Sequence, residues 1–99
     1  MAVYVDQERN GFRRMVMCHM IADTLDELHE MADLIGLRRE WFQGDGSFPH
    51  YDVALARRAR ALRFGAIEVT RREGYEIRKR LRADPAFIEA WRAEIRQEA

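Results

Sequence analysis

The 99-residue sequence is 47% hydrophobic and 34% charged, and its 17 basic residues balance 17 acidic ones. This length predicts a single domain over residues 1–99, with an α/β core over residues 1–70 and a helical extension over residues 71–99. A single cysteine excludes a disulfide within the chain. No apolar run approaches the roughly 18 residues of a membrane span, and residues 1–9 lack a signal-peptide pattern. We therefore expect a cytoplasmic protein with no membrane partner.

Charge is distributed unevenly along the chain. Residues 1–52 hold ten acidic residues against five arginines, whereas residues 53–99 hold twelve basic residues against seven acidic ones. The basic half can attract phosphate groups, but a neutral chain lacks the surplus of positive charge that nonspecific DNA binding needs. This balance argues against nucleic acid as a partner and leaves a small anionic molecule as the better expectation.

The first third of the chain predicts two strands. Residues 3–5 alternate apolar and polar side chains and form a short strand, followed by a polar loop over residues 7–14. Residues 15–22 are almost continuously apolar, which indicates a strand buried on both faces. Alternation along this strand places His19 on one face and Cys18, a packing residue, on the other.

A helix follows at once. Thr24 and Glu27 form the pattern of a capping box at its start, and Gly36 occupies the position of a glycine that ends a helix. Between them runs an apolar stripe made of Leu25, Leu28, Ala32 and Ile35.

The rest of the chain predicts a loop, three helices and one strand. A helix over residues 53–64, with Asp52 as its N-cap, precedes a strand over residues 66–70. Its series of arginines between residues 57 and 63 is typical of a solvated helix face. A short basic helix over residues 75–82 and a last helix opened by Asp84-Pro85 complete the chain. The apolar side of the last helix consists of Phe87, Ile88, Trp91 and Ile95.

The order β-β-α-α-β-α-α predicts an α/β fold in which helices flank a small, mostly parallel three-stranded sheet. Ligands of open parallel sheets bind outside the carboxyl ends of the strands. Asp6 ends the first strand and Asp23 follows the second. If these two strands are parallel, both carboxylates open onto the same edge.

Four motifs carry a family resemblance. They are the run from Cys18 to Asp23, Glu27-Leu28-His29, Ile35-Gly36-Leu37 and His50-Tyr51-Asp52. Together they resemble a small bacterial and phage family, the domain of unknown function numbered 4031, over about residues 3–69. The resemblance implies no activity, but it implies that these polar residues belong to the family's own pattern.

All three histidines lie in these motifs, accompanied by Asp23 and Asp52. In one shared pocket they can act as general base and orienting acid in phosphoester or nucleotide chemistry. The HxxxH, HExxH and CxxC spacings of common metal sites are missing, so we predict no cofactor and keep a divalent metal as the weaker alternative. The structural alternatives are a buried neutral His19, a His29 paired on a helix flank, and a helix cap formed by residues 50–52.

The segment around residues 38–42 adds arginines and aromatic rings. Arg38 and Arg39 can pair with a phosphate, and Trp41 can stack on a base. The alternative is a solvated arginine pair beside an aromatic residue that packs the loop on the core. Glycines of a phosphate-binding loop are missing around Gly44 and Gly46.

These observations predict a protein that binds an anionic, nucleotide-like molecule and hydrolyses a phosphoester in it. The predicted catalytic residues are His19, His50 and Asp52; the predicted ligand-binding residues are Asp6, Asp23, His29, Arg38, Arg39, Trp41 and Tyr51. Binding without turnover, as in a phage protein that sequesters a nucleotide, leaves the same pattern. The competing hypothesis is an interaction protein, a homodimer formed through Phe87, Trp91 and Ile95.

Overall fold

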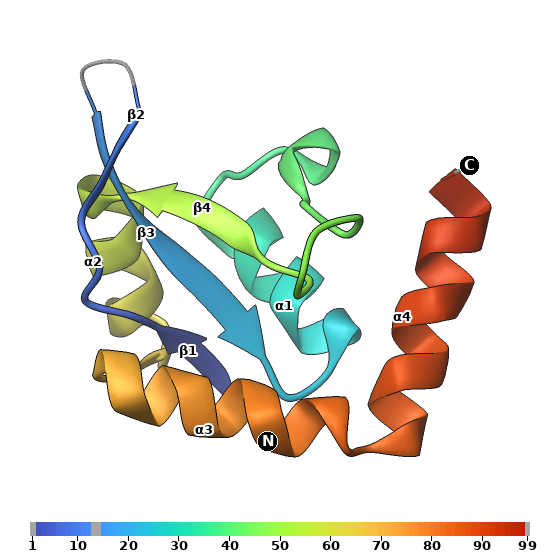
Figure 1. Ribbon diagram of the computed structural model, residues 1–99. Helices are drawn as coiled ribbons and strands as arrows, with labels where there is room; N and C mark the ends of the chain where they lie inside the picture. The colour runs from blue at the N-terminus through green and yellow to red at the C-terminus, as the bar shows by residue number, and fades with distance from the viewer. Residues whose placement is uncertain (1, 13–14, 99) are drawn as a thin grey trace.

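Five short strands form one mixed sheet in the computed structural model, which describes residues 2–12 and 15–98 (Figure 1). Strand β3 is the longest and lies at the centre. Its residue Met17 pairs with both β2 and β4, and Met20 pairs with both β1 and β4, so β4 occupies one edge of β3 while β1 and β2 share the other. The strands are β1 (Val3–Val5), β2 (Asn10–Phe12), β3 (Met15–Ala22), β4 (Tyr51–Ala54) and β5 (Ile67–Glu68).

The α/β class and the flanking helices agree with the sequence prediction, but the strand directions do not. β3 runs antiparallel to β1, β2 and β4, and among the described strands only β1 and β5 pair in parallel. The physical reason is the short connection between β1 and β3, because parallel neighbours need a crossover of a dozen or more residues. The prediction of a mostly parallel three-stranded sheet was therefore wrong.

Reversing β3 also separates the two carboxylates that were expected to share an edge. The Asp6 N–H donates to the His19 carbonyl in the middle of β3 (3.1 Å), whereas the Asp23 N–H donates to Ala2 at the start of β1 (2.9 Å). Asp6 and Asp23 therefore lie at opposite ends of β1, and the predicted common edge does not exist.

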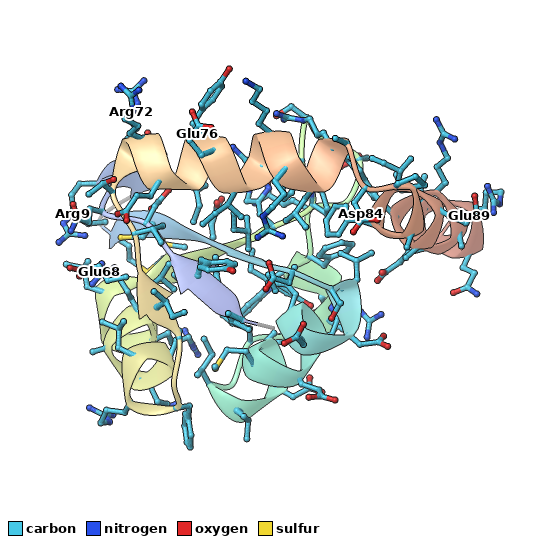
Figure 2. The ribbon with its side chains drawn as sticks, turned by 90° about the horizontal axis from the view of Figure 1, so that it is seen from below. Arg9, Glu68, Arg72, Glu76, Asp84 and Glu89 are labelled. Atoms are coloured by element: carbon cyan, nitrogen blue, oxygen red, sulfur yellow. The ribbon has the colours of Figure 1, made fainter. Side chains whose placement is uncertain are left out.

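Helices cover the sheet unequally. In Figure 2, α3 lies on one side of the sheet, and α1 and α2 lie on the other. Their core contributions include Leu28 of α1, Ala61 of α2, Leu81 of α3 and Phe87 of α4, so the C-terminal helices belong to the same core as the sheet. The helices are α1 (Leu25–Leu34), the 3₁₀ turn η1 (Arg39–Trp41), α2 (Leu55–Arg63), α3 (Arg71–Arg82) and α4 (Pro85–Glu98).

Helix starts follow local chemistry with two corrections. The Thr24 hydroxyl accepts from the Glu27 N–H as expected, but the complete capping box belongs to Thr70 and Glu73, which start α3 before residue 75. Ala54 rather than Asp52 is the N-cap of α2, because residues 51–54 form β4. Gly36 ends α1 with a φ of 83°, a backbone conformation that favours glycine.

No helix within residues 2–12 and 15–98 is long and apolar enough to cross a membrane.

Candidate functional site

His19 and Asp52 are cross-strand partners on β3 and β4. Their neighbours in the strands, Met20 and Tyr51, point to the opposite face and are fully buried. Because side chains alternate along a strand, His19 and Asp52 share the face that α1 and α2 do not cover. We call this surface of β3 and β4 the open face, and the surface that carries Tyr51 the covered face.

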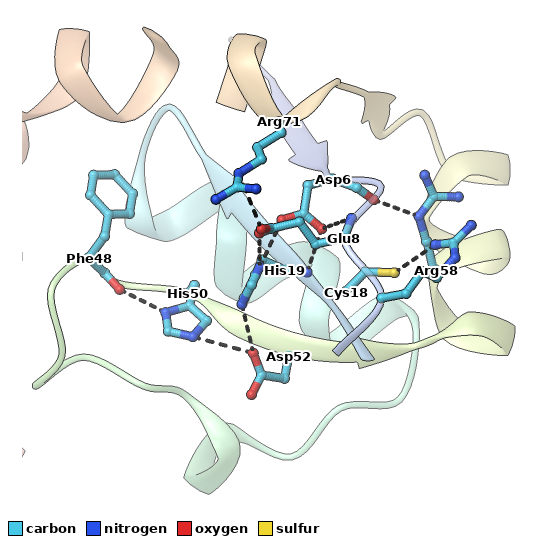
Figure 3. A network of polar contacts seen from close by, with 10 residues as sticks. Asp6, Glu8, Cys18, His19, Phe48, His50, Asp52, Arg58 and Arg71 are labelled. Carbon is cyan, nitrogen blue, oxygen red and sulfur yellow. Dashed lines mark hydrogen bonds and ion pairs between the residues drawn. The ribbon is translucent and has the colours of Figure 1, made fainter. Parts of the chain in front are cut away.

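His50 joins His19 and Asp52 on the open face. It immediately precedes β4 and forms an isolated β-bridge with Gln43, which fixes its backbone. The rings of His19 and His50 lie edge to face with 5.3 Å between centroids. Asp52 Oδ1 is 3.3 Å from His50 Nε2 and 3.8 Å from His19 Nε2. We call these three residues the His–Asp cluster, which Figure 3 shows from close by.

A break between β1 and β2 brings two more carboxylates to His19. β1 ends at Val5 and β2 begins at Asn10. The Asp6 N–H still donates to the His19 carbonyl, but the Asp6 carbonyl accepts from Arg58 instead of from His19. Asp6 Oδ1 accepts from the His19 backbone N–H (2.9 Å), and Oδ2 lies 2.7 Å from His19 Nδ1. Glu8 Oε2 lies 3.0 Å from the same ring nitrogen. The carboxylate of Asp6 thus replaces a missing β-ladder acceptor and orients the imidazole.

The contact between Asp6 and His19 shifts the pKa of both side chains. The hydrogen bond to Asp6 raises the pKa of His19, outweighing the opposing effect of burial. Burial acts to raise the pKa of Asp6, but hydrogen bonds from the His19 ring and backbone outweigh it and hold that pKa below its ordinary value. Both shifts favour a carboxylate at Asp6 that faces a hydrogen on His19 Nδ1.

His50 is oriented in a similar manner. Its Nδ1 lies 2.8 Å from the Phe48 carbonyl oxygen, which can only accept a hydrogen bond. Nδ1 therefore carries the hydrogen of a neutral ring, and the lone pair is on Nε2. In both histidines of the cluster, Nδ1 faces an acceptor and Nε2 faces Asp52.

Arg58 supports the segment that carries Asp6. It is 7% exposed, its Nε donates to the Asp6 carbonyl (2.9 Å), and its Nη2 donates to Glu68 (2.6 Å). The expected solvated arginine face of residues 57–63 is therefore incorrect at this position. Arg58 lies three residues before the buried Ala61 and four before Leu62, which packs against the core, so helical spacing was the signal that could have placed it on the inner side of α2.

An apolar trough adjoins the His–Asp cluster. It has a volume of about 490 Å³, and its lining includes Met17 of β3, Ala54 of β4 and the Trp41 ring. Asp52 lines the trough as well, and its Oδ2 accepts from the Gln43 side-chain amide (2.7 Å). Asp52 therefore belongs both to the cluster and to the trough.

Arg57 also lines the trough. Its guanidinium carbon is 5.7 Å from the centroid of the Trp41 ring, within the range of a cation–π contact. Its Nε is buried and has no hydrogen-bond partner among residues 2–12 and 15–98. The sequence prediction missed Arg57, Gln43 and Glu8 because they reach the open face from a helix, an isolated bridge and a strand break.

His29 lies on the covered face, away from the other two histidines. Its Nδ1 is 2.8 Å from the Tyr51 hydroxyl, and its Nε2 is 2.6 Å from Glu94 of α4. The ring also packs edge to face on Phe42. His29 and Tyr51 are 7% and 0% exposed, so neither can contact a ligand on the open face, contrary to the prediction that all three histidines meet.

Asp23, another predicted ligand-binding residue, is engaged in holding chain segments together. Its carboxylate accepts from the Ala2 N–H (2.8 Å), the Tyr4 hydroxyl (3.0 Å) and Arg80 of α3 (2.8 Å). Burial acts to raise the pKa of Asp23, but Arg80 and the other donors outweigh it and lower that pKa.

The predicted phosphate-binding arginines have partners within the chain. Arg38 pairs with Glu40 (2.7 Å), and Arg39 pairs with Glu94 (2.8 Å). Trp41 is 43% exposed and lines the trough. Of the ten predicted site residues, four contribute to the open-face site, namely Asp6, His19, His50 and Asp52, and Trp41 stands beside it.

The fold and this site define a small α/β domain with histidines and carboxylates clustered on the open face of a mixed sheet. The chain belongs to the family described as Protein of unknown function (DUF4031), whose model matches residues 3–83. The match extends the resemblance past residue 69 through α3. No curated protein and no solved structure matched the chain.

Proposed function

We propose that the open face binds a small phosphoester with a planar ring, such as a nucleotide, and hydrolyses it. The observation that carries this proposal is the convergence of His19, His50 and Asp52 at one end of the apolar trough. A trough of about 490 Å³ suits a small molecule. The Trp41 ring can stack on a planar base, and Arg57 supplies a positive charge beside it.

The His–Asp cluster supplies the groups that hydrolysis needs. An imidazole with a free Nε2 lone pair takes a proton from water, and a nearby carboxylate stabilises the imidazolium that forms. His50 and Asp52 have this relation. The water oxygen then bonds to phosphorus, its proton passes to His50 Nε2, and the ester oxygen leaves with the bonding electron pair and takes a proton from solvent.

Arg57 replaces Arg38 and Arg39 in this proposal. The latter two arginines are paired with Glu40 and Glu94, whereas Arg57 lines the trough and forms no ion pair with a carboxylate among the described residues. A ligand anion that reaches the Arg57 guanidinium gains a charge-assisted hydrogen bond.

Ligand binding is tested by thermal unfolding with a panel of nucleoside mono- and diphosphates. A ligand that binds the folded chain raises the melting temperature, by about 4–8 °C per kcal/mol of stabilisation in a domain of this size. Trp41→Ala and Arg57→Gln should reduce that rise, whereas Arg38→Gln, outside the trough, should leave it unchanged. If no member of the panel shifts the melting temperature, the proposed binding is wrong.

Turnover is tested with p-nitrophenyl phosphate and bis-p-nitrophenyl phosphate. Asp52→Asn and His50→Ala should lower the rate by about 10²–10⁴-fold, the usual contribution of a general base, while circular dichroism stays unchanged. Binding of a nucleotide without hydrolysis of any phosphoester would leave a sequestering protein as the function.

The competing function, dimerisation through α4, loses part of its predicted contact surface. Phe87 is buried and stacks on Phe48, with 5.4 Å between centroids, and Trp91 Nε1 donates to the Gly44 carbonyl at 2.6 Å. These side chains are used inside the chain. A homodimer stays a prediction, to be checked by the mass of the protein in solution.

A further inference from the structure

We infer that His19 Nε2, His50 Nε2 and Asp52 Oδ1 bind one divalent metal ion of the zinc class. The inference builds on the proposed function because it concerns the same three side chains. It goes beyond that function by naming an ion, and it is tested without any substrate. One ligand atom from each residue lies within 4.8 Å of the other two.

The orientation of both histidines is the first argument. The hydrogen-bond partner of His19 Nδ1 is the Asp6 carboxylate (2.7 Å), and that of His50 Nδ1 is the Phe48 carbonyl (2.8 Å). An acceptor on Nδ1 leaves the lone pair on Nε2, which is the atom that binds a metal. Histidines that bind metals have this kind of outer acceptor almost always.

The convergence of the two Nε2 atoms on one carboxylate is the second argument. They lie 3.8 Å and 3.3 Å from Asp52 Oδ1. Zinc binds imidazole nitrogen and carboxylate oxygen at about 2.0–2.2 Å, so a small rotation of the side chains brings all three atoms onto one ion. Gln43 donates to the other Asp52 oxygen, Oδ2 (2.7 Å), and thereby leaves Oδ1 directed at the histidines.

Exposure is the third argument, because an ion must be able to enter. The side chains of His19, His50 and Asp52 are 32%, 20% and 36% exposed. Two histidines and one carboxylate give three protein ligands, and in catalytic zinc sites water or substrate takes the fourth position. The adjoining trough is the place from which a substrate reaches that position.

Charge gives the ion a function. The carboxylates of Asp6, Glu8 and Asp52 surround the two imidazoles, and their negative charge opposes the approach of a phosphate. A divalent cation offsets this repulsion, polarises the phosphoryl oxygen and lowers the pKa of bound water. With the ion bound, the Nε2 lone pair of His50 is a metal ligand and no longer accepts a proton, so the ion rather than His50 activates the attacking water. The imidazole and carboxylate donors favour an ion such as Zn²⁺ or Co²⁺ over Mg²⁺, which prefers ligand sets made of oxygen alone.

A second group competes for the ion. Asp6, Glu8 and His19 Nδ1 also lie within reach of one another. In that arrangement the ion displaces the hydrogen on Nδ1 and leaves His50 aside. The His–Asp cluster is favoured because it uses two imidazoles and leaves Asp6 as an outer acceptor, and the two arrangements predict different variants.

The experiment uses protein dialysed against a chelator and then titrated with Zn²⁺ by calorimetry, and with Co²⁺ by its visible absorption. We expect one ion per chain. His50→Gln and Asp52→Asn should each weaken binding by at least about 100-fold. Asp6→Asn should weaken it by about 10–100-fold, the usual effect of losing an outer partner. Glu8→Gln should leave the affinity within about threefold.

His29→Gln is the matched control, because it removes a histidine from the covered face and should leave ion binding unchanged. Circular dichroism of each variant separates a lost site from a lost fold; His50 and Asp52 are part-exposed, so their variants should fold. The inference is overturned if wild-type protein binds no ion. It is also overturned if Glu8→Gln abolishes binding while His50→Gln does not.

The outcomes for the ion and for the proposed function are separable. One bound Zn²⁺ with the expected variant pattern supports the metal site even if no phosphoester is hydrolysed. Turnover that persists undiminished after chelation, without ion binding, supports the hydrolytic site and overturns the metal.

Discussion

The two faces of β3 and β4 use the same residue types in opposite ways. On the covered face, His29 has a partner on each ring nitrogen, and the surrounding side chains bury it. On the open face, His19 and His50 each have an acceptor on Nδ1 and direct Nε2 toward one carboxylate. The difference teaches that residue type does not decide function here. His29 is structural because it is buried and both of its ring nitrogens have partners, whereas His19 and His50 form a candidate site because their Nε2 atoms point to the same carboxylate.

The largest expected effect concerns the apolar packing of the covered face. Leu28 of α1 is 1% exposed, so Leu28→Ala should lower the free energy of unfolding by about 2–5 kcal/mol. Leu34→Ala on the same helix is the matched control, because Leu34 is 57% exposed and should cost no more than about 0.5 kcal/mol. Urea unfolding of both variants measures the difference, and equal losses would contradict the assignment of the covered face.

The histidines themselves give the next effect. His29→Ala removes one hydrogen bond each from the buried Tyr51 hydroxyl and the part-buried Glu94 carboxylate and should cost about 1–3 kcal/mol. His50→Ala should stay within about 0.5 kcal/mol of wild type, since a part-exposed side chain is lost. Chemical denaturation checks both variants. A reversed order would show that the open-face histidines, not His29, hold the fold.

A smaller effect depends on pH and on the paired carboxylate of Asp23. Its pKa is lower in the folded chain than the ordinary 3.8. Its contribution to stability is therefore complete above that value and fades as the pH falls through the lowered pKa, because the unfolded chain takes up the proton first. In Asp23→Asn, the free energy of unfolding should fall less steeply as the pH drops below about 4. Asp45→Asn, in an exposed loop, is the control and should leave the acid profile unchanged.

The smallest expected effect is on the surface, at the arginines first assigned to a ligand. Arg38→Ala breaks an ion pair with Glu40 in which both side chains are more than 60% exposed, so stability should change by less than about 0.5 kcal/mol. The change should also leave binding of any nucleotide unaltered. A loss of ligand affinity in Arg38→Ala, measured by calorimetry, would return this arginine to the site.

The sequence predicted the elements that depend on local chemistry. The helix after Thr24, the glycine at position 36 and the start of α4 after Asp84 rest on caps and turns, which act within a few residues. β4 was missed because it is only four residues long, Tyr51–Ala54, and α2 begins directly after it. Such a short alternation of buried and part-exposed side chains does not distinguish a strand from the start of a helix. Pairing with β3, a tertiary effect, decides the conformation of that segment.

The candidate site was also predicted only where it depends on local sequence patterns. His19 and its face follow from alternation along β3, and the His-Tyr-Asp motif pointed to His50 and Asp52. The approach of Asp6 could not be foreseen, because it depends on a break in the ladder between β1 and β2. The separation of His29 depends on which face α1 covers, and helical periodicity alone does not give that.

α4 lies outside the span that the family model matches, yet it supports the loop that carries His50. Trp91 donates to Gly44, and Phe87 stacks on Phe48, whose carbonyl orients the imidazole of His50. A chain cut back to residues 3–83 would keep all the reactive side chains but lose this brace. The geometry of the open face therefore depends on the contacts of α4 with this loop as well as on the strands that carry the side chains.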